Sequence, residues 1–167
     1  MNNVTIPSNI EKMDRDEFLS FLDTTPSALS MTFKVLGIGV TDYGIDYNPQ
    51  VDSEKWIIED NARNDHTSNQ KQGSVEQKIY KGDPCFEFVK TARDKTNFKT
   101  HILDIDMFDG NGSTYPATLS DGMIVITKFM NEDAVIEYDL YYNGDAQEGT
   151  VTFDNDGVPT FVANTSL

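Results

Sequence analysis

The sequence predicts a mainly β domain with one helix, in which antiparallel strands form a β-sandwich or an open barrel and an α-helix lies on its flank. Two observations support this prediction. Seven or eight segments alternate apolar with polar residues, whereas one segment, residues 84–95, has apolar residues at helical spacing. Turn residues separate the segments at regular intervals, as in antiparallel sheets. At 167 residues the chain fits one domain, which we place at residues 15–167.

Ahead of this domain, residues 1–14 are polar, contain a proline and show no sustained period, which predicts an N-terminal arm outside the core. The next segment is DEFLSFLDTT. Its apolar residues Phe18, Leu19, Phe21 and Leu22 have spacings that fit a short amphipathic helix or a strand, and we favour the strand.

Two alternating segments follow, at residues 30–40 and 42–49. In the first, Phe33 and Val35 alternate with polar residues, which is typical of a half-buried strand. Because the segments are consecutive, we expect them to pair as neighbouring antiparallel strands.

Residues 48–74 are mostly polar, with one apolar group at Trp56, Ile57 and Ile58. A loop this long within a compact domain is usually functional or becomes ordered on a partner. Two roles for Trp56 remain open: a plug in its own core, or an anchor in another chain, because interfaces are enriched in tryptophan. The loop length predicts an interface loop, with Trp56, Ile57, Ile58 and Asn61 as the candidate contact residues.

Residues 74–80 resume the alternation and lead into the helical segment. There Asp83 is placed to act as N-cap and Pro84 to occupy the first helical position, where its missing N–H costs nothing. Phe86 and Val89 then form an apolar stripe, which predicts a short helix from Pro84 to about Lys95 that packs on the sheet.

The second half of the chain reads as strands at residues 98–109, 121–129, 133–142 and 148–154. Two of these strands carry acids on one side. Asp104 and Asp106 alternate with Leu103 and Ile105, and Glu137 and Asp139 alternate with apolar residues in the same way. We expect both acidic faces to be solvated.

Cys85 follows Pro84 in the first turn of the predicted helix, an environment that lowers the pKa of a thiol. A nucleophilic thiol also needs a base, and the chain offers only His66, in the polar loop, and His101, in a predicted strand. We therefore favour a packing role for Cys85 over a catalytic one.

Other site motifs are weak. DIDMFDGNGST, from Asp104, suggests a calcium loop, but with Asp104 as the first ligand Phe108 and Tyr115 fall where an EF-hand needs acids. We interpret DGNG as a turn and expect no metal. The chain also lacks a phosphate loop, a dinucleotide fingerprint and a serine elbow, so we expect no cofactor.

The charge of the chain argues against a protein that binds nucleic acid. The chain has 28 acidic and 13 basic residues, a net charge of −15 and a sequence pI near 4.2, so it should repel DNA. Its apolar runs are too short to cross a bilayer, we expect no signal peptide, and one cysteine precludes an internal disulfide. These features predict a soluble protein made inside the cell.

Several segments, in the same order along residues 15–154, resemble the major tail protein, or tail tube protein, of long-tailed bacteriophages that infect Gram-positive bacteria. The segments are RDEFLSFL at residues 15–22, IDYNP at 45–49, WIIEDNA at 56–62, YKGDPCFEFV at 80–89 and YNGDAQEGTVTFD at 142–154. In the last of these, the family turn G-D-P-x-x-G-T has Ala146 where proline is usual.

The resemblance implies a β-sandwich with a flanking helix, shared with type VI secretion tube proteins, that closes into hexameric rings and stacks into a tube for genome delivery. It implies a structural virion protein and not an enzyme. The implied partners are copies of itself and the tape measure, distal tail and tail terminator proteins, with DNA only in transit. The implied location is the virion tail, assembled in the host cytoplasm.

In such a ring the sheet facing the axis is polar, and an acidic wall lets DNA slide because it offers the phosphates no favourable contacts. The candidates for the wall are Asp104 with Asp106, or Glu137 with Asp139. The alternative function is a small acidic β-sandwich binding module, of carbohydrate or adhesin type, with Tyr141 and Tyr142 in its site.

Overall fold

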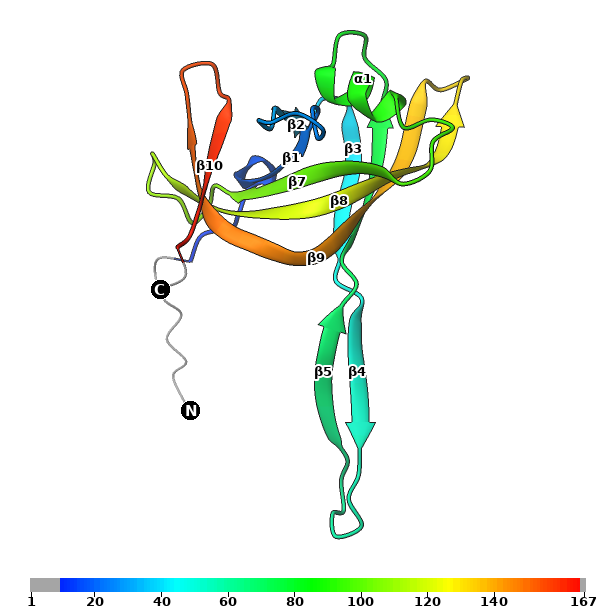
Figure 1. The fold of residues 1–167 in the computed structure, drawn as a ribbon, viewed down its shortest axis with the longest axis vertical. Coiled ribbons are helices and arrows are strands. Elements are labelled where there is room, and N and C mark those ends of the chain that lie inside the picture. The colour runs from blue at the N-terminus through cyan, green and yellow to red at the C-terminus, as the bar shows by residue number, and fades with distance from the viewer. Residues whose placement is uncertain (1–9, 166–167) are drawn as a thin grey trace, which may run out of the picture.

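A computed structural model of the chain describes residues 10–165 (Figure 1). Strands account for 55% of the protein and helices for 6%, and the main sheet is a curled antiparallel half-barrel. The prediction of a mainly β fold with one α-helix is therefore confirmed, and the open barrel is the form that the sheet takes. Of the predicted N-terminal arm, residues 1–9 lie outside the described residues, and residues 10–14 are exposed and have no regular structure.

The main sheet has eight strands, seven of them in the order β2-β1-β7-β8-β9-β6-β3, with β10 paired to β9. Their bounds are β1 Phe18–Asp23, β2 Phe33–Leu36, β3 Val40–Asp46, β6 Gln72–Lys78, β7 Phe98–Asp106, β8 Tyr115–Met130, β9 Val135–Phe153 and β10 Pro159–Ala163. A short 3-10 helix, η1 (Arg15–Glu17), precedes β1. The segment DEFLSFLDTT thus forms a strand, as expected.

The expected pairing of β2 with β3 is wrong, because these strands are the opposite edges of the sheet: β2 pairs with β1, and β3 pairs with β6. Alternation marks a strand but carries no information about its partner. Residues 37–39 alone join the two edges, and three residues span at most about 11 Å. The short connection therefore requires the edges to lie close together, which curls the sheet. Gly39, at φ +72°, makes this turn, and a Cβ there would lie 2.3 Å from the Lys78 carbonyl oxygen.

Residues 48–74, expected to be a loop, contain a β-hairpin that projects from the barrel (Figure 1). Strands β4 (Pro49–Glu54) and β5 (Arg63–Asn69) form a separate two-stranded antiparallel sheet. Both faces of this hairpin meet water, so its residues need no alternation of apolar and polar side chains. The usual sequence signal of a strand was therefore missing.

β9 also differs from the expectation, since one strand replaces the two predicted at residues 133–142 and 148–154. Asn143 pairs with Asp121 and Gln147 pairs with Leu119, so β9 has three residues where β8 has one. The expected family turn is thus a bulge, at which Gly144 takes φ +67°. The turn expected at DNDG, after β9, is confirmed, because Asp154 accepts the backbone N–H groups of Asp156 and Val158.

The α-helix, α1 (Pro84–Lys90), packs on one face of the sheet, which we call the inner face; the opposite face is the outer face. Asp83 accepts the Cys85 backbone N–H at 3.0 Å and Pro84 begins the helix, as expected. The helix ends at Lys90 and not near Lys95, because the backbone N–H groups of Thr91, Ala92 and Arg93 donate to carbonyls three residues back instead of four.

Apolar side chains fill two clusters. The larger lies between α1 and the inner face and contains Leu22, Val75, Cys85, Phe86, Val89, Ile102, Ile124, Ile136, Tyr138 and Leu140. The smaller lies on the outer face around β1 and β7 and contains Phe21, Phe33, Leu103, Ile105, Ala117 and Val151. Because both faces are covered around β1 and β7, the polar residues of these strands have limited access to water.

A buried polar network fixes α1 to the sheet. The Gln77 side-chain amide donates to Asp83 Oδ2 and to the Ile38 carbonyl, both at 2.8 Å, and accepts from the Tyr138 hydroxyl at 3.0 Å. Gln77 is fully buried, and a buried amide without partners would cost stability. Gln77 therefore joins the helix cap, the β2–β3 connection and the sheet.

Candidate assembly surfaces

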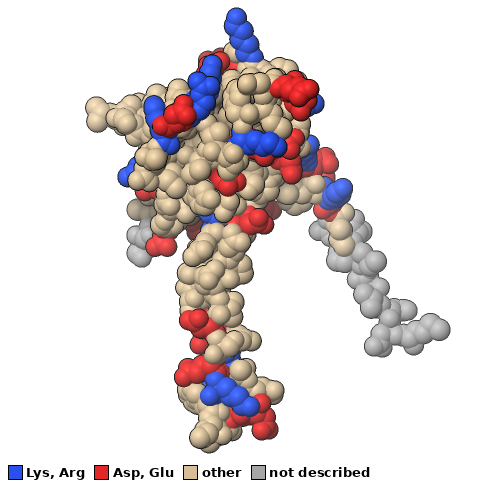
Figure 2. Space-filling view, turned by 90° about the vertical axis from the view of Figure 1, so that its right-hand side faces the viewer, with Lys and Arg blue, Asp and Glu red and all other residues tan. Residues whose placement is uncertain are grey.

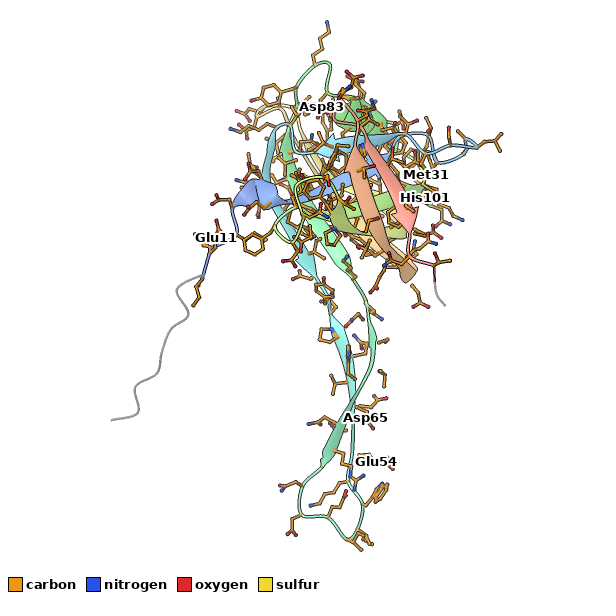
Figure 3. The ribbon with its side chains drawn as sticks, turned by 90° about the vertical axis from the view of Figure 1, so that its left-hand side faces the viewer. Glu11, Met31, Glu54, Asp65, Asp83 and His101 are labelled. Carbon is orange, nitrogen blue, oxygen red and sulfur yellow. The ribbon has the colours of Figure 1, made fainter. Side chains whose placement is uncertain are left out.

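The hairpin projects away from the barrel (Figures 1 and 3), and every residue of its two strands is exposed. Its stem is held by backbone pairing and by polar side chains, such as the Ser53 hydroxyl donating to Asn64 Oδ1 at 2.6 Å. Charged side chains gather at its far end, whereas the part near the barrel shows none (Figure 2). An isolated two-stranded hairpin is marginally stable in water. The element therefore contributes little to the stability of its own chain.

The hairpin tip, residues 55–62, carries the apolar group that the sequence singled out. Ile57 and Ile58 are 104% and 86% exposed, and Trp56 is 49% exposed. The Arg63 guanidinium lies 4.3 Å from the centre of the Trp56 ring and pairs with Glu59, while Asn61 is exposed beside them. Trp56 is not part of its own core, so the role of a core plug is wrong, and the role of an anchor in another chain stays a prediction. Contiguous exposed apolar side chains of this kind mark interaction sites.

The hairpin base is bonded to the barrel. Gln70 N–H donates to the Tyr47 carbonyl at 3.0 Å, and the Asn48 side-chain amide donates to the Gln70 carbonyl at 3.2 Å. The Lys71 ammonium lies 3.0 Å from Asp104 Oδ2 and 4.0 Å from the centre of the Tyr142 ring. The first two bonds join the two sides of the hairpin base to each other, and Lys71 connects this base to Asp104 on β7 and Tyr142 on β9.

The prediction of a solvated face is wrong for Asp104, which is 3% exposed. It lies on the inner face and accepts from the Ser20 hydroxyl at 2.5 Å, the Tyr142 hydroxyl at 3.2 Å and Lys71. The alternation placed it correctly on the face opposite Leu103, but here both faces of β7 are covered, so this side is buried as well. Asp106, nearer the strand end, is half-buried and accepts the Asp109 backbone N–H at 3.2 Å.

Burial and the charge of Asp104 raise the pKa values of the two tyrosine hydroxyls beside it. Burial, and then the Asp104 carboxylate, raise the pKa of Tyr43 from 10.0 to about 12. The same two causes, in the same order, raise the pKa of Tyr142. Both phenols therefore stay protonated and available as hydrogen-bond donors at neutral pH.

Glu137 and Asp139 lie on the outer face, where the sheet register adds acids that the sequence pattern did not single out. Asp42 pairs with Glu76, and Glu76 pairs with Glu137, so three carboxylates form a row across β3, β6 and β9. Lys128 lies 3.7 Å from Glu137. We call Asp42, Glu76, Glu137 and Asp139 the acidic row. Only the register between strands places Asp42 and Glu76 there, so neither residue could be found from the sequence.

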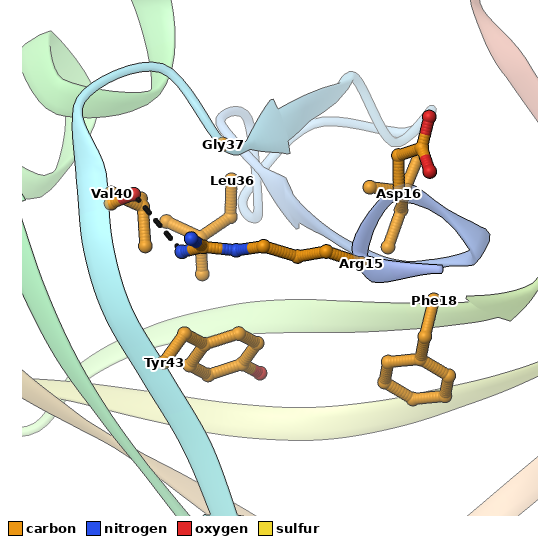
Figure 4. Close-up of a pocket in the computed structure, with 8 residues that line it drawn as sticks. Arg15, Asp16, Phe18, Leu36, Gly37, Val40 and Tyr43 are labelled. Carbon is orange, nitrogen blue, oxygen red and sulfur yellow. Dashed lines mark hydrogen bonds between the residues drawn. The ribbon is translucent and has the colours of Figure 1, made fainter. Parts of the chain in front are cut away.

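A cleft of about 510 Å³ separates the two edges of the half-barrel (Figure 4). Arg15 reaches across it and donates to the carbonyls of Val40 and Thr41, at 3.4 and 3.2 Å, on the free edge of β3. Unpaired edge strands invite pairing with other chains. Arg15 thus occupies part of this edge. The cleft is the gap at which the sheet does not close into a full barrel.

The Cys85 thiol is fully buried in the larger core cluster. Burial, and then the Asp83 carboxylate, raise the pKa of Cys85 to about 12, so the thiol is neutral at physiological pH. His66 lies on the projecting hairpin, and His101 Nδ1 contacts Asp23 Oδ2 at 2.8 Å. The structure therefore supports the packing role, and both histidines lie outside the core cluster that holds this thiol.

Other features bear on ligands. Asn111 accepts the backbone N–H groups of Ser113 and Thr114, which confirms the DGNG turn. Within residues 10–165, no group of three or more His, Cys, Asp or Glu side chains is placed to hold a metal ion. In the same residues, no helix is long and apolar enough to cross a membrane.

The sequence matches no protein-family model and shows no significant match to a curated protein.

Proposed function

We propose that this chain is a structural subunit that assembles with itself into stacked hexameric rings, forming the tail tube through which a bacteriophage delivers its genome. The observation that carries the proposal is the projecting hairpin, which exposes Trp56, Ile57 and Ile58 at its tip. Exposed apolar residues at the end of a long projection have no role in an isolated domain. They have one in a chain whose function is to contact other copies.

The fold is compatible with this role. A curled antiparallel sheet with a helix on one face offers a free strand edge on β2 and on β3, and the outer face of the sheet carries the acidic row. If the part of the outer face that carries the acidic row lines the tube, its carboxylates repel the phosphates of passing DNA. The net charge of −15 favours the same outcome. The tape measure, distal tail and terminator proteins are then the partners at the ends of the tube.

The test is the oligomeric state of the purified full-length chain. Light scattering after size-exclusion chromatography, over a hundredfold range of concentration, should show growth from monomer to ring-sized and larger species. Negative-stain microscopy should show rings or hollow tubes. A chain that stays monomeric at every concentration, with or without an assembled tail tip as template, would contradict the proposal and favour the alternative binding module.

A further inference from the structure

An apolar groove of about 400 Å³ lies on the outer face between β1, β2 and the turn that joins β9 to β10. Its lining residues include Phe21, Phe33, Val35, Phe153 and Val158. Phe21 and Phe33 are 5% and 7% exposed and form the floor, whereas Val158, at 40% exposed, stands at the rim. A groove of this volume falls in the range of about 300–1,000 Å³ typical of sites that take a small ligand, so it has room for large side chains.

The groove and the hairpin tip lie at opposite ends of the molecule. In Figure 1 the β9–β10 turn and β2 stand at the end near α1, and the hairpin β4–β5 points away from them along the longest axis. The tip of one chain therefore cannot reach its own groove. A second copy displaced along the long axis can place its tip there.

The chemistry of the two surfaces is complementary. The tip offers three adjacent apolar side chains, Trp56, Ile57 and Ile58, and the groove offers an apolar floor. Both surfaces carry charges of both signs that can pair across the contact: Lys34 and Asp156 line the groove, and Lys55 and Asp60 flank the apolar residues of the tip. Apolar residues surrounded by pairable charges are the usual composition of a specific protein contact.

We propose that this groove receives the hairpin tip of a second copy of the chain, so that copies join head to tail. The inference rests on the proposed function, because it requires self-assembly. Two different surfaces meet in such a contact, and a heterologous contact that repeats by translation does not close on itself. The resulting stack is open-ended, and every hairpin in it points the same way.

Disulfide trapping tests the contact. One protein carries Ile57→Cys and a second carries Val158→Cys, both in a Cys85→Ala background that removes the natural thiol. Equal amounts of the two are mixed at an assembling concentration and oxidised. We expect a linked heterodimer in at least roughly tenfold excess over the link formed between Ile57→Cys and a control, Val125→Cys, whose residue is similarly exposed on the outer face at 38%.

The outcomes separate the two proposals. Assembly without a preferred link between positions 57 and 158 would overturn the groove assignment and leave the tube proposal standing. A mixture that stays monomeric and unlinked would overturn both.

A second measurement does not depend on cysteine chemistry. Val158→Asp should raise the concentration needed for assembly at least about tenfold, because it puts a charge at an apolar contact. Val162→Asp, at a residue 60% exposed on β10 and outside the groove lining, is the matched control and should leave that concentration unchanged. Circular dichroism checks that both variants fold. Equal effects of the two substitutions would argue against the groove as the receiving surface.

Discussion

Two residues show how the environment decides what a side chain does. Cys85 occupies the first turn of a helix, where its pKa would usually fall, yet burial in the core raises that pKa to about 12. Asp104 belongs to a strand that alternates acids with apolar residues, yet its carboxylate is buried and bonded to Lys71 and two hydroxyls. In both residues the local pattern is overridden by the packing of distant segments.

Cys85 should be dispensable for assembly. Cys85→Ala removes a small buried side chain and should lower the free energy of unfolding by about 1–2 kcal/mol, since the site can partly collapse. Urea unfolding measures the cost, and electron microscopy should still show assembled particles. Loss of assembly by a folded Cys85→Ser variant would revive a chemical role for the thiol.

Stability should decrease in alkali. In the folded chain the pKa of Cys85 is raised from 9.0 to about 12 and that of Tyr43 from 10.0 to about 12, whereas the unfolded chain keeps the ordinary values. The stabilisation from both groups is therefore complete below pH 9 and is lost as the pH rises towards 12. Each group contributes a slope of about 1.4 kcal/mol per pH unit above its unfolded pKa.

Urea midpoints at pH 8 and pH 10 measure this loss. Tyr138 and Tyr142, whose pKa values burial also raises, contribute in the same direction. Cys85→Ala should decrease the loss between the two pH values, because it removes the group that ionises first on unfolding. An equal loss in wild type and variant would contradict the assignment to Cys85.

The Lys71–Asp104 pair should behave as a coupled unit. Lys71→Met leaves a buried carboxylate without its counter-charge and should cost about 1–3 kcal/mol of unfolding free energy. The double variant with Asp104→Asn should cost less than the sum of the single changes. Lys128→Met breaks a more exposed pair with Glu137 and should cost under about 1 kcal/mol. Additive effects at positions 71 and 104 would show that the two side chains act independently.

At the scale of elements, the hairpin β4–β5 and the helix α1 are opposites. The helix is short but buries Cys85, Phe86 and Val89, so its place is fixed by the core. The hairpin is longer but has all its strand residues exposed, and its base is held by the Lys71–Asp104 pair and a few backbone bonds. Removing a tip side chain should therefore change contacts between molecules and leave the chain's own stability unchanged.

Trp56→Ala tests this separation. The variant should keep its circular dichroism spectrum and lie within about 0.5 kcal/mol of the wild-type unfolding free energy, because Trp56 is outside the core. It should lose assembly, since a tryptophan anchor contributes about 2 kcal/mol or more to an interface. Val51→Ala, on the hairpin stem and similarly exposed at 53% against 49% for Trp56, is the control and should assemble normally. Unfolding caused by Trp56→Ala would mean that the tip supports its own chain.

For the whole molecule, the main property is charge and where the fold places it. Of the two acidic faces expected from the sequence, Asp104 is buried, whereas Glu137 and Asp139 lie on the outer face with Asp42 and Glu76 beside them. The acidic row therefore becomes the candidate for the wall that faces DNA. Substituting lysine for Asp104 would bury a second cation beside Lys71, so that change would test the stability of the chain and not the bore.

The double variant Glu137→Lys with Asp139→Lys should assemble but retain DNA. It replaces carboxylates that repel phosphates with ammonium groups that attract them, and the attraction should weaken as salt is added. Binding of short duplex DNA to assembled particles, measured between 50 and 500 mM salt, checks this. Reversal at Asp52 and Asp65 of the hairpin stem, two exposed acids, is the control. Assembled particles of the double variant that bind no more DNA than wild type would place the acidic row outside the bore.

Features that depend on neighbours within a few residues are predictable from the sequence alone. The sequence predicted most strands of the barrel from alternation, the start of α1 from Asp83 and Pro84, and the overall negative charge. It also identified Trp56, Ile57 and Ile58 as an unusual apolar group within polar sequence. Alternation, capping and composition are local properties, so they can be recognised without knowing the fold.

The three-dimensional fold is needed to establish which strands pair, which sheet face is covered and where the long polar segment lies. It placed β2 and β3 on opposite edges, buried Asp104, and aligned Asp42 with Glu76 across a strand pair. Alternation assigns residues to two faces but does not say which face meets water. That depends on contacts between segments far apart in the chain, and the exposed hairpin, which buries nothing, has no hydrophobic pattern by which it could be predicted.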